Sequence, residues 1–293
     1  MEQLIEKAAL LIEALPYIQQ FRNSVVLVKF GGSAMEDPEV TRSVIRDVVF
    51  MECAGMKPII VHGGGKAISA QLKAEGVPTR FVNGLRYTCE KTIRVVDRVL
   101  HEQINAELVR MMREVNGMPC PVSGKNVLRA ERETTTDPAT GQEVDLGLVG
   151  RVVNVDTEQL RWVLARGEVP VITPLACDMS GRVYNVNADM AACVVAAQMK
   201  VRKLVFLSDV PGVLRNPADE ASLISTIRRG EVEALIRDGV LTGGMVPKVR
   251  SAAEAIDAGV SKVHMIDGRV RHSLLLELLT DRGVGTQIVS DNA

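Results

Sequence analysis

One arrangement occurs twice near the start of the chain: a short run of apolar residues, then consecutive glycines, then a helical pattern. Val25–Val28 leads into Gly31–Gly32, and Pro58–Val61 leads into Gly63–Gly65. Continuous apolar runs of this kind are typical of strands that are covered on both faces. Strands that alternate with helices imply crossover units, so the pattern predicts an α/β fold with a mainly parallel sheet between two layers of helices. Helices are expected over residues 38–54 and 67–75.

Further buried strands are expected at Pro170–Thr173, Leu204–Leu207 and Val263–Ile266, because each is another short apolar run. Between residues 126 and 155 the pattern changes to short alternating segments around the turn-rich stretch Asp137–Gly141. That change predicts a β-hairpin at the surface.

The composition is that of a globular protein with two domains or two lobes. The chain has 293 residues, of which 46% are hydrophobic and 24% are charged, and a domain takes roughly 150 residues. The 35 Lys and Arg residues nearly balance the 36 Asp and Glu residues, and only 3% of the residues are aromatic. Neither a basic groove nor a base-stacking surface is indicated, so we expect no nucleic-acid partner.

The cysteines and the N-terminal segment favour a cytoplasmic protein. The five cysteines form an odd set without a C-x-x-C pair, so no disulfide framework or zinc ribbon is expected. Charged residues interrupt the N-terminal apolar run, which is wrong for a secretory signal. No stretch approaches the roughly 18 apolar residues of a membrane span, so no membrane partner is expected.

The first residues carry an apolar stripe at helical spacing. We expect Pro16 to kink or end this helix. The stripe could pack on the domain's own core or form an arm that binds a neighbouring subunit, and the pattern leaves both alternatives open. The stripe consists of Leu4, Ile5, Ala8, Leu11, Ile12 and Leu15.

Glycines that directly follow a buried strand let backbone N–H groups approach an anion at the start of the next helix. Neither glycine turn matches a Walker A or Rossmann fingerprint, and either could be a simple connection. Lys29 ends the first strand beside such a turn, and Lys248 lies in a glycine-rich helix start. A lysine at a helix N-terminus opposes the helix dipole, so an anion would give Lys248 a reason to be there.

Polar residues before a second helix complete the candidate set. Asn185, Asn187 and Asp189 precede a run of small apolar residues, and one of them is expected to cap that helix. Arg86 could bind a carboxylate with two hydrogen bonds or be solvated surface. The four histidines lack metal-ligand spacing and no Gly-x-Ser-x-Gly elbow occurs, which argues against metalloenzymes and serine hydrolases.

Together these motifs resemble the amino acid kinase family, and within it the branch that acts on N-acetyl-L-glutamate. The resemblance runs from about Val25 to Ile288. It departs from the usual pattern at Lys66, which adds a charge beside the second glycine turn, and at Cys193, which is expected to be a small core residue. The motifs are Lys29–Gly32, Val61–Gly65, Asn83–Arg86, Val122–Lys125, Asp145–Gly150, Asn185–Asp189, Leu207–Val210, Gly243–Lys248 and Ile266–Arg269.

The resemblance implies a three-layer αβα sandwich with an interlinking helix over residues 1–22, an amino-acid lobe over residues 23–200 and an ATP lobe over residues 201–293. It implies transfer of the γ-phosphoryl group of ATP to the side-chain carboxylate of N-acetyl-L-glutamate, a step of arginine biosynthesis. Mg²⁺ would be held mainly by the phosphates, and no metal site made by the protein is expected.

The resemblance also assigns roles to individual residues. Lys29 and Lys248 would flank the transferring phosphoryl group, and Asp189 would hold both lysines. Arg86 would bind the α-carboxylate of the acceptor, Asn185 would complete its pocket, and the amides of Gly64 and Gly65 would bind it. The nucleotide would lie at Gly31, Gly32, Ser208, Asp209, Gly243 and Gly244.

The N-terminal helix resembles the extension found in arginine-inhibited forms of this branch. The resemblance implies a homo-oligomer, at least a dimer and up to a hexamer built as a trimer of dimers, inhibited by arginine and open to a PII-type signalling protein. The arginine would lie among Tyr17, Lys203, His272, Glu277 and Gly285. Two rivals stay open: another kinase of the family, acting on aspartate, glutamate, carbamate or uridylate, and a catalytically silent arginine-binding scaffold.

Overall fold

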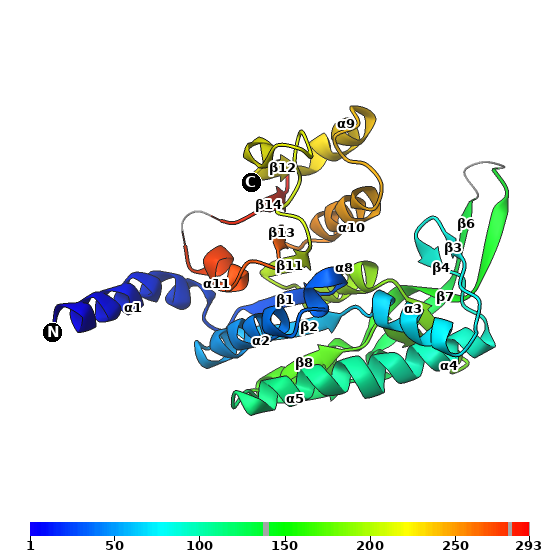
Figure 1. The fold of residues 1–293 in the computed structure, drawn as a ribbon, viewed down its shortest axis with the longest axis horizontal. Helices are drawn as coiled ribbons and strands as arrows, with labels where there is room; N and C mark the ends of the chain where they lie inside the picture. Colours follow the sequence, from blue (N-terminus) through cyan, green and yellow to red (C-terminus); the bar gives the residue numbers. More distant parts are fainter. Residues whose placement is uncertain (137–140, 281–282, 293) are drawn as a thin grey trace.

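The computed structural model describes residues 1–136, 141–280 and 283–292. Its centre is an eight-stranded sheet in the order β12-β14-β13-β11-β1-β2-β8-β5, in which all neighbours run parallel except β13 and β14 (Figure 1). This confirms the predicted α/β fold with a mainly parallel sheet. The strands are β1 (Val25–Phe30), β2 (Lys57–His62), β5 (Pro119–Val122), β8 (Val169–Ile172), β11 (Lys203–Ser208), β12 (Thr226–Arg228), β13 (Val263–Asp267) and β14 (Thr286–Val289).

The two faces of β1 belong to two different cores. Val26, Val28 and Phe30 point into the core that includes α2 (Pro38–Cys53) and α5 (Ala106–Glu114). Leu27 points into the opposite core, which includes α8 (Ala188–Met199) and α10 (Met245–Asp257). Because side chains alternate along a strand, Lys29 lies on the same face as Leu27. The alternation therefore places this lysine toward α8 and α10.

Helices cover both faces of the sheet. Helix α2 begins as its sequence predicts, because Pro38 occupies the first turn and the Asp37 carboxylate accepts hydrogen bonds from the N–H groups of Glu39 and Val40. The helices are α1 (Glu2–Phe21), α2 (Pro38–Cys53), α3 (Gly65–Ala74), α4 (Glu90–Arg98), the π-helical segment η2 (Val99–Asn105), α5 (Ala106–Glu114), α6 (Gly124–Val127), α7 (Thr157–Ala165), α8 (Ala188–Met199), α9 (Val232–Arg237), α10 (Met245–Asp257) and α11 (Ser273–Leu278), with short turns η1 (Gly32–Met35), η3 (Glu220–Ser222) and η4 (Arg229–Glu231).

The predicted hairpin is confirmed as β6 (Leu128–Thr136) and β7 (Glu143–Val155), which pair antiparallel. Only part of it is surface structure, because it closes a small barrel with β9 (Leu175–Cys177) and β10 (Val183–Val186). Of the predicted turn, residues 137–140 lie outside the described residues. A two-stranded hairpin of β3 (Phe81–Val82) and β4 (Leu85–Arg86) stands beside this barrel (Figure 1).

Helix α1 projects from the body of the molecule (Figure 1). Of the two outcomes expected at Pro16, a kink or an end, the end is wrong, because the helix continues to Phe21. The Phe21 ring is buried under the Arg202 guanidinium and the Lys203 ammonium. The alternative that the stripe packs on its own core is also wrong, because its large members, Leu4, Ile5, Leu11, Ile12 and Leu15, are all exposed in the single chain. In the part of the chain that is described, no helix combines the length and apolarity that a membrane span needs.

Candidate active site

A partly buried carboxylate holds two lysines together near the carboxyl end of the central strand β1. The Lys29 Nζ atom lies 2.7 Å from a carboxylate oxygen of Asp189, and the Lys248 Nζ atom lies 3.6 Å from the other. Lys29 comes from β1, Asp189 from the first turn of α8 and Lys248 from the first turns of α10. These side chains come together because Lys29 lies on the face of β1 that packs against α8 and α10. We call these three residues the Asp189 cluster.

The Asp189 carboxylate is ionised and its cluster carries an excess of positive charge. Burial alone would raise the pKa of Asp189, but the charges of Lys29 and Lys248 and their hydrogen bonds outweigh it and hold the pKa below its usual value. Asn187 caps α8 by accepting hydrogen bonds from the N–H groups of Asp189 and Met190. One of the polar residues before this helix is thus the predicted cap.

The two glycine turns lie against each other beside Lys29. A Cβ atom on Gly31 would lie 2.7 Å from the Lys29 Nζ atom and 3.4 Å from the Gly63 Cα atom. A Cβ atom on Gly64 would lie 2.6 Å from a terminal carbon of Ile104. A side chain at Gly31 would fill the space beside the lysine and one at Gly64 would clash with Ile104, so both positions favour glycine.

A cavity of about 500 Å³ opens at this point. Most residues predicted for acceptor binding and catalysis face it, whereas Lys248 reaches it only through Asp189. Lys66 stands at the cavity and forms an ion pair with Glu36. The lining includes Lys29, Gly32, Glu36, Gly63, Gly64, Gly65, Lys66, Ser69, Phe81, Arg86, Asn185, Asn187 and Asp189.

Arg86 lies in the wall of the cavity with one side of its guanidinium already bound. Its Nη2 atom donates to the Gly65 carbonyl oxygen at 2.9 Å and to the Ser69 hydroxyl at 2.8 Å. Its Nη1 atom is buried and has no hydrogen-bond partner among the described residues. The ring of Phe81 lies 4.6 Å from the guanidinium carbon. Burial lowers the pKa of Arg86, and an anion would satisfy the remaining donors.

Ser69 and Phe81 are contacts that the sequence analysis missed. Ser69 follows Gly65 by four residues in α3, a spacing that puts both on one side of a helix. That spacing was the available signal for Ser69. Phe81 is opposite Arg86 in the β3–β4 hairpin, and only the pairing of those strands reveals it.

The residues predicted for the nucleotide do not all lie in this lining. Gly32 lines the cavity and adopts a φ of +74°, which favours glycine. Ser208 ends β11, and its hydroxyl donates to the Val210 carbonyl oxygen at 3.0 Å. Gly243, with a φ of +53°, and Gly244 precede α10 and have open space where a Cβ would be. Asp209 follows the buried Ser208 and is itself exposed.

A second carboxylate, the buried Glu277, lies near the end of α1. The Lys203 Nζ atom lies 3.0 Å and the His264 Nδ1 atom 2.5 Å from the same oxygen of Glu277. Burial would raise the pKa of Glu277, but His264 and Lys203 outweigh it and lower the pKa. We call these three residues the Glu277 cluster. The sequence analysis did not place His264 here, because the apolar pattern of its strand indicates only that the strand is buried.

The Glu277 cluster forms part of a cavity of about 1170 Å³. Tyr17, Lys203, Glu277 and Gly285 line it, as the predicted effector site would require. His272 does not, because its Nδ1 atom lies 2.6 Å from the buried Asp47 carboxylate of α2. The family resemblance had placed His272 at the effector, whereas in the structure it connects the start of α11 to α2.

All five cysteines are free, and Cys193 is buried in α8 as predicted. Among the residues that the structure describes, no group of three or more His, Cys, Asp or Glu side chains is placed to hold a metal ion.

Structural comparison identifies the same architecture in several solved proteins. An N-acetylglutamate synthase from Neisseria gonorrhoeae, complexed with coenzyme A and N-acetyl-glutamate, matches with a TM-score of 0.84 at 24% identity, covering 96% of this chain and 63% of that chain. A carbamate kinase from Giardia lamblia bound to AMP-PNP matches with a TM-score of 0.64 at 18% identity, covering 92% of this chain and 99% of that chain. At these identities the likeness shows the fold.

Sequence comparison gives nearer relatives. An acetylglutamate kinase of Akkermansia muciniphila is 43% identical over 290 residues, which cover 99% of this chain and 97% of that protein. An acetylglutamate kinase of Caldanaerobacter subterraneus subsp. tengcongensis is 46% identical over 286 residues, which cover 97% and 93%. The model of the amino acid kinase family matches residues 24–267, which hold the Asp189 cluster and both glycine turns. With full-length relatives and this match in agreement, the chain belongs to the amino acid kinase family.

Proposed function

We propose that this protein transfers the γ-phosphoryl group of ATP to the side-chain carboxylate of N-acetyl-L-glutamate. The observation that carries the proposal is the Asp189 cluster at the edge of a cavity that also contains Arg86 and Asn185. Relatives named acetylglutamate kinase over nearly the whole chain support the same substrate.

The chemistry of the acceptor fits this site. A carboxylate is already ionised at about pH 7 and needs no general base to attack phosphorus. The barrier is repulsion between an anionic acceptor and an anionic phosphoryl donor, which fixed cations and amide donors reduce. In the proposed mechanism Lys29 and Lys248 stabilise the charge on the transferring group. Asp189 is a positioning residue that keeps the two ammonium groups close together.

Specificity for the acceptor would come from the opposite wall of the cavity. Arg86 would bind the α-carboxylate with the donors that Gly65 and Ser69 leave free. Asn185, whose Nδ2 atom donates to the Thr88 hydroxyl at 3.2 Å, would complete that pocket. The amides of Gly64 and Gly65 would complete the contacts. An unacetylated amino acid has an ammonium group where the acetylated one has a neutral amide. A wall that contains Arg86 does not favour this additional positive charge.

The nucleotide would approach from the side of β11 and α10. Gly31, Gly32, Ser208, Asp209, Gly243 and Gly244 would contact it. Mg²⁺, held mainly by the ATP phosphates, would add positive charge to the donor. In this scheme residues 23–200 form the acceptor lobe and residues 201–293 the nucleotide lobe. Both lobes contribute strands to one continuous sheet.

Regulation would use the other end of the molecule. The exposed stripe on α1 is suited to pack against α1 of another copy, with residues 1–22 as the interlinking helix of a hexamer. Arginine would bind in the cavity of the Glu277 cluster, where the guanidinium or the α-amino group could pair with the carboxylate. Docking of a PII-type protein and a cytoplasmic location belong to the same proposal.

The decisive experiment measures ADP release from ATP with each of several acceptors. We expect release with N-acetyl-L-glutamate and far less with glutamate, aspartate, carbamate or uridylate at equal concentration. Preference for any of those four would assign the protein to another kinase of the family. Arginine binding without ADP release from any acceptor would favour the silent scaffold.

A further inference from the structure

A line of three hydrogen bonds connects the second glycine turn to the centre of the sheet. The Nδ1 atom of His62, the last residue of β2, lies 2.9 Å from the Gly63 carbonyl oxygen. Its Nε2 atom lies 3.1 Å from the Nδ2 atom of Asn105, which also donates to the Val171 carbonyl oxygen at 2.9 Å. Both His62 and Asn105 are buried, with 0% and 3% of their surfaces exposed. Water therefore does not compete for these bonds.

The two carbonyl groups at the ends fix every proton in this line. A carbonyl oxygen only accepts, so Asn105 must present its NH₂ group to Val171. The second N–H of that NH₂ group then points at Nε2 of His62, which must accept. At the other end the Gly63 carbonyl also accepts, so Nδ1 of His62 must carry the proton. A neutral imidazole has one donor and one acceptor nitrogen and satisfies both demands.

The neutral ring is the stable form at this position. Burial is the largest cause that lowers the pKa of His62 to about 4, and the charges of Lys29 and His101 act in the same direction, although the hydrogen bond to Gly63 opposes them. An imidazolium would also set a second N–H against the NH₂ group of Asn105. The line of bonds is therefore intact at neutral pH.

Asn105 reaches His62 from a segment that also packs on the glycine turn. It is the last residue of η2, the π-helical segment between α4 and α5. Leu100 and Ile104 of the same segment contact the turn so closely that a Cβ on Gly64 would lie 2.8 Å and 2.6 Å from their terminal carbons. Wide π-helical turns are frequent at functional sites. One segment thus supports the turn by packing and by hydrogen bonding.

The Gly63 carbonyl controls the direction of the next amide. The Gly63 N–H donates to the Phe30 carbonyl oxygen at 2.7 Å, so the turn is also held at its start. In a trans peptide the C=O and N–H groups point in opposite directions. Holding the Gly63 carbonyl against His62 therefore turns the N–H of Gly64, a residue of the cavity wall, away from the imidazole.

We propose that His62 and Asn105 are positioning residues that aim the Gly64 amide at the acceptor substrate. The inference rests on the proposed function, because N-acetyl-L-glutamate is the ligand that the amide is to bind. Neither side chain lines the cavity, so both act through the backbone of the turn.

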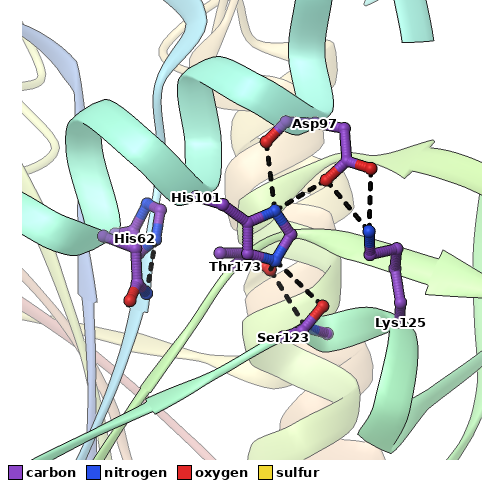
Figure 2. Close-up of polar contacts among 8 residues, drawn as sticks. His62, Asp97, His101, Ser123, Lys125 and Thr173 are labelled. Atoms are coloured by element: carbon purple, nitrogen blue, oxygen red, sulfur yellow. Dashed lines mark hydrogen bonds and ion pairs between the residues drawn. The ribbon is translucent and has the colours of Figure 1, made fainter. Parts of the chain in front are cut away.

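A second polar network on the same helix offers a matched control. His101, also in η2, lies 2.7 Å from an Asp97 carboxylate oxygen through Nδ1 and 2.9 Å from the Ser123 hydroxyl through Nε2 (Figure 2). Lys125 binds the same carboxylate at 2.8 Å. This network anchors the helix to the end of β5 and, within the described part of the chain, makes no hydrogen bond to the glycine turn. Ser123→Ala therefore disturbs the helix and spares the turn.

The test compares Asn105→Ala with Ser123→Ala in steady-state kinetics. Asn105→Ala leaves the Val171 carbonyl and the His62 ring without their donor, and we expect the KM for N-acetyl-L-glutamate to rise about tenfold. The KM for ATP should change less than about twofold in both variants, as should the acceptor KM of Ser123→Ala. An unchanged acceptor KM in Asn105→Ala, or equal rises for both substrates, would overturn the proposal.

Asn105→Asp adds a readout that a purely structural role would not produce. The carboxylate accepts from Nε2 and favours a second proton on His62, against the charges of Lys29 and His101. The doubly protonated ring can donate to both neighbours, whereas the neutral ring has one proton for two acceptors. Between about pH 6 and about pH 9, the acceptor KM of this variant, divided by that of the wild type, should rise. A flat ratio contradicts the assignment.

Hydrogen exchange of the amides in residues 63–66 tests the positioning without turnover. Faster exchange in Asn105→Ala than in Ser123→Ala supports the line of bonds, and equal exchange refutes it. If Asn105→Ala does not fold, His62→Asn, which keeps a donor near Gly63, should retain more acceptor binding than His62→Ala. A wild-type protein inactive on N-acetyl-L-glutamate would sink the proposed function, while the exchange result would still decide on the turn.

Discussion

Two carboxylates of this chain, Asp189 and Glu277, are each held by basic side chains, and they lie at opposite ends of the neighbouring strands β1 and β11. Asp189 contacts Lys29 near the end of β1, whereas Glu277 contacts Lys203 at the start of β11. Because β1 and β11 run parallel, with Val26 opposite Lys203, the two clusters lie at opposite ends of the parallel strands. In open parallel sheets, ligands bind at the carboxyl ends of the strands.

The clusters differ in their balance of charge. Asp189 faces two lysines, so that cluster retains a positive charge for a phosphoryl group. Glu277 faces one lysine and His264, whose pKa is lowered, chiefly by burial. With a neutral His264, the Glu277 cluster is balanced and can accept a ligand that brings its own cation. If the proposed roles hold, charge excess rather than burial separates the site for phosphoryl transfer from the site for an effector.

The largest expected effect comes from removing a lysine of the Asp189 cluster. Lys29→Ala or Lys248→Ala should lower kcat by about 10²–10³, because each removes one fixed donor of the transition state. The control is Lys57→Ala, which removes a lysine from the opposite end of the neighbouring strand β2. Rates of ADP release decide the matter. Near-wild-type turnover in either cluster variant would refute these roles and erase the contrast between the clusters.

Deleting residues 1–21 should affect only the other cluster. The deletion removes Tyr17, Gln20 and Phe21 from the wall of the cavity near Glu277, and the exposed stripe with them. We expect loss of arginine inhibition and a smaller assembly, with little change in kcat. Light scattering gives the mass, and ADP release with and without arginine gives the sensitivity. A truncated protein that stays hexameric and arginine-sensitive would contradict the proposal.

The contact between Asp47 and His272, which connects α2 to the start of α11, can be tested independently of the Glu277 cavity. Burial raises the pKa of Asp47 to about 6, although the hydrogen bond and charge of His272 oppose it. The pKa of Asp47 is higher in the folded state than in the unfolded state. Protonated Asp47 therefore contributes to the free energy of unfolding in full at low pH, and this contribution is lost as the pH rises through about 6. Asp47→Asn should therefore gain up to about 3 kcal/mol over wild type at high pH and little below about pH 4.

Unfolding by urea at several pH values measures this difference. Glu39→Gln, at an exposed position of the same helix, is the control and should show no such pH dependence. A gain in Asp47→Asn that is the same at all pH values would mean that packing or hydrogen bonding, not ionisation of Asp47, is responsible.

The smallest effect is expected at Lys66. Its ammonium group is exposed and already paired with the exposed Glu36 carboxylate, and such pairs contribute roughly 0–1 kcal/mol. Lys66→Gln should change the acceptor KM by less than about fivefold. A larger change would mean that the charge of Lys66 belongs to the substrate site, and the positive excess there would then extend beyond the Asp189 cluster.

Local sequence signals predicted the sheet and much of its surroundings. The runs at Val25–Val28 and Leu204–Leu207 became central strands because every residue of such a run can be buried. Asp37 and Asn187 cap their helices as short polar residues do. The roles of Lys29 and Lys248, by contrast, came from the family resemblance, because a single lysine at a strand end is usually solvated.

Contacts between distant segments could not be predicted. His62 and Asn105 are joined across 43 positions of sequence, and only the offset of a π-helical segment brings them together. His272 meets Asp47 across 225 positions. Pro16 does not end α1, since the ring fixes a φ that helices accept and the burial of Phe21 favours continuation. In each case tertiary packing decides what local propensity leaves open.

The position of α1 has a practical consequence for anyone who prepares this protein. The N-terminus stands at the far tip of a projecting helix whose Leu4, Ile5, Leu11, Ile12 and Leu15 side chains are exposed in the single chain (Figure 1). An affinity tag fused ahead of Met1 would sit beside the stripe through which copies are expected to meet. A tag after the C-terminal strand β14 would leave that stripe free of added residues. Native mass and effector titrations should therefore be measured on protein that carries its tag at the C-terminus.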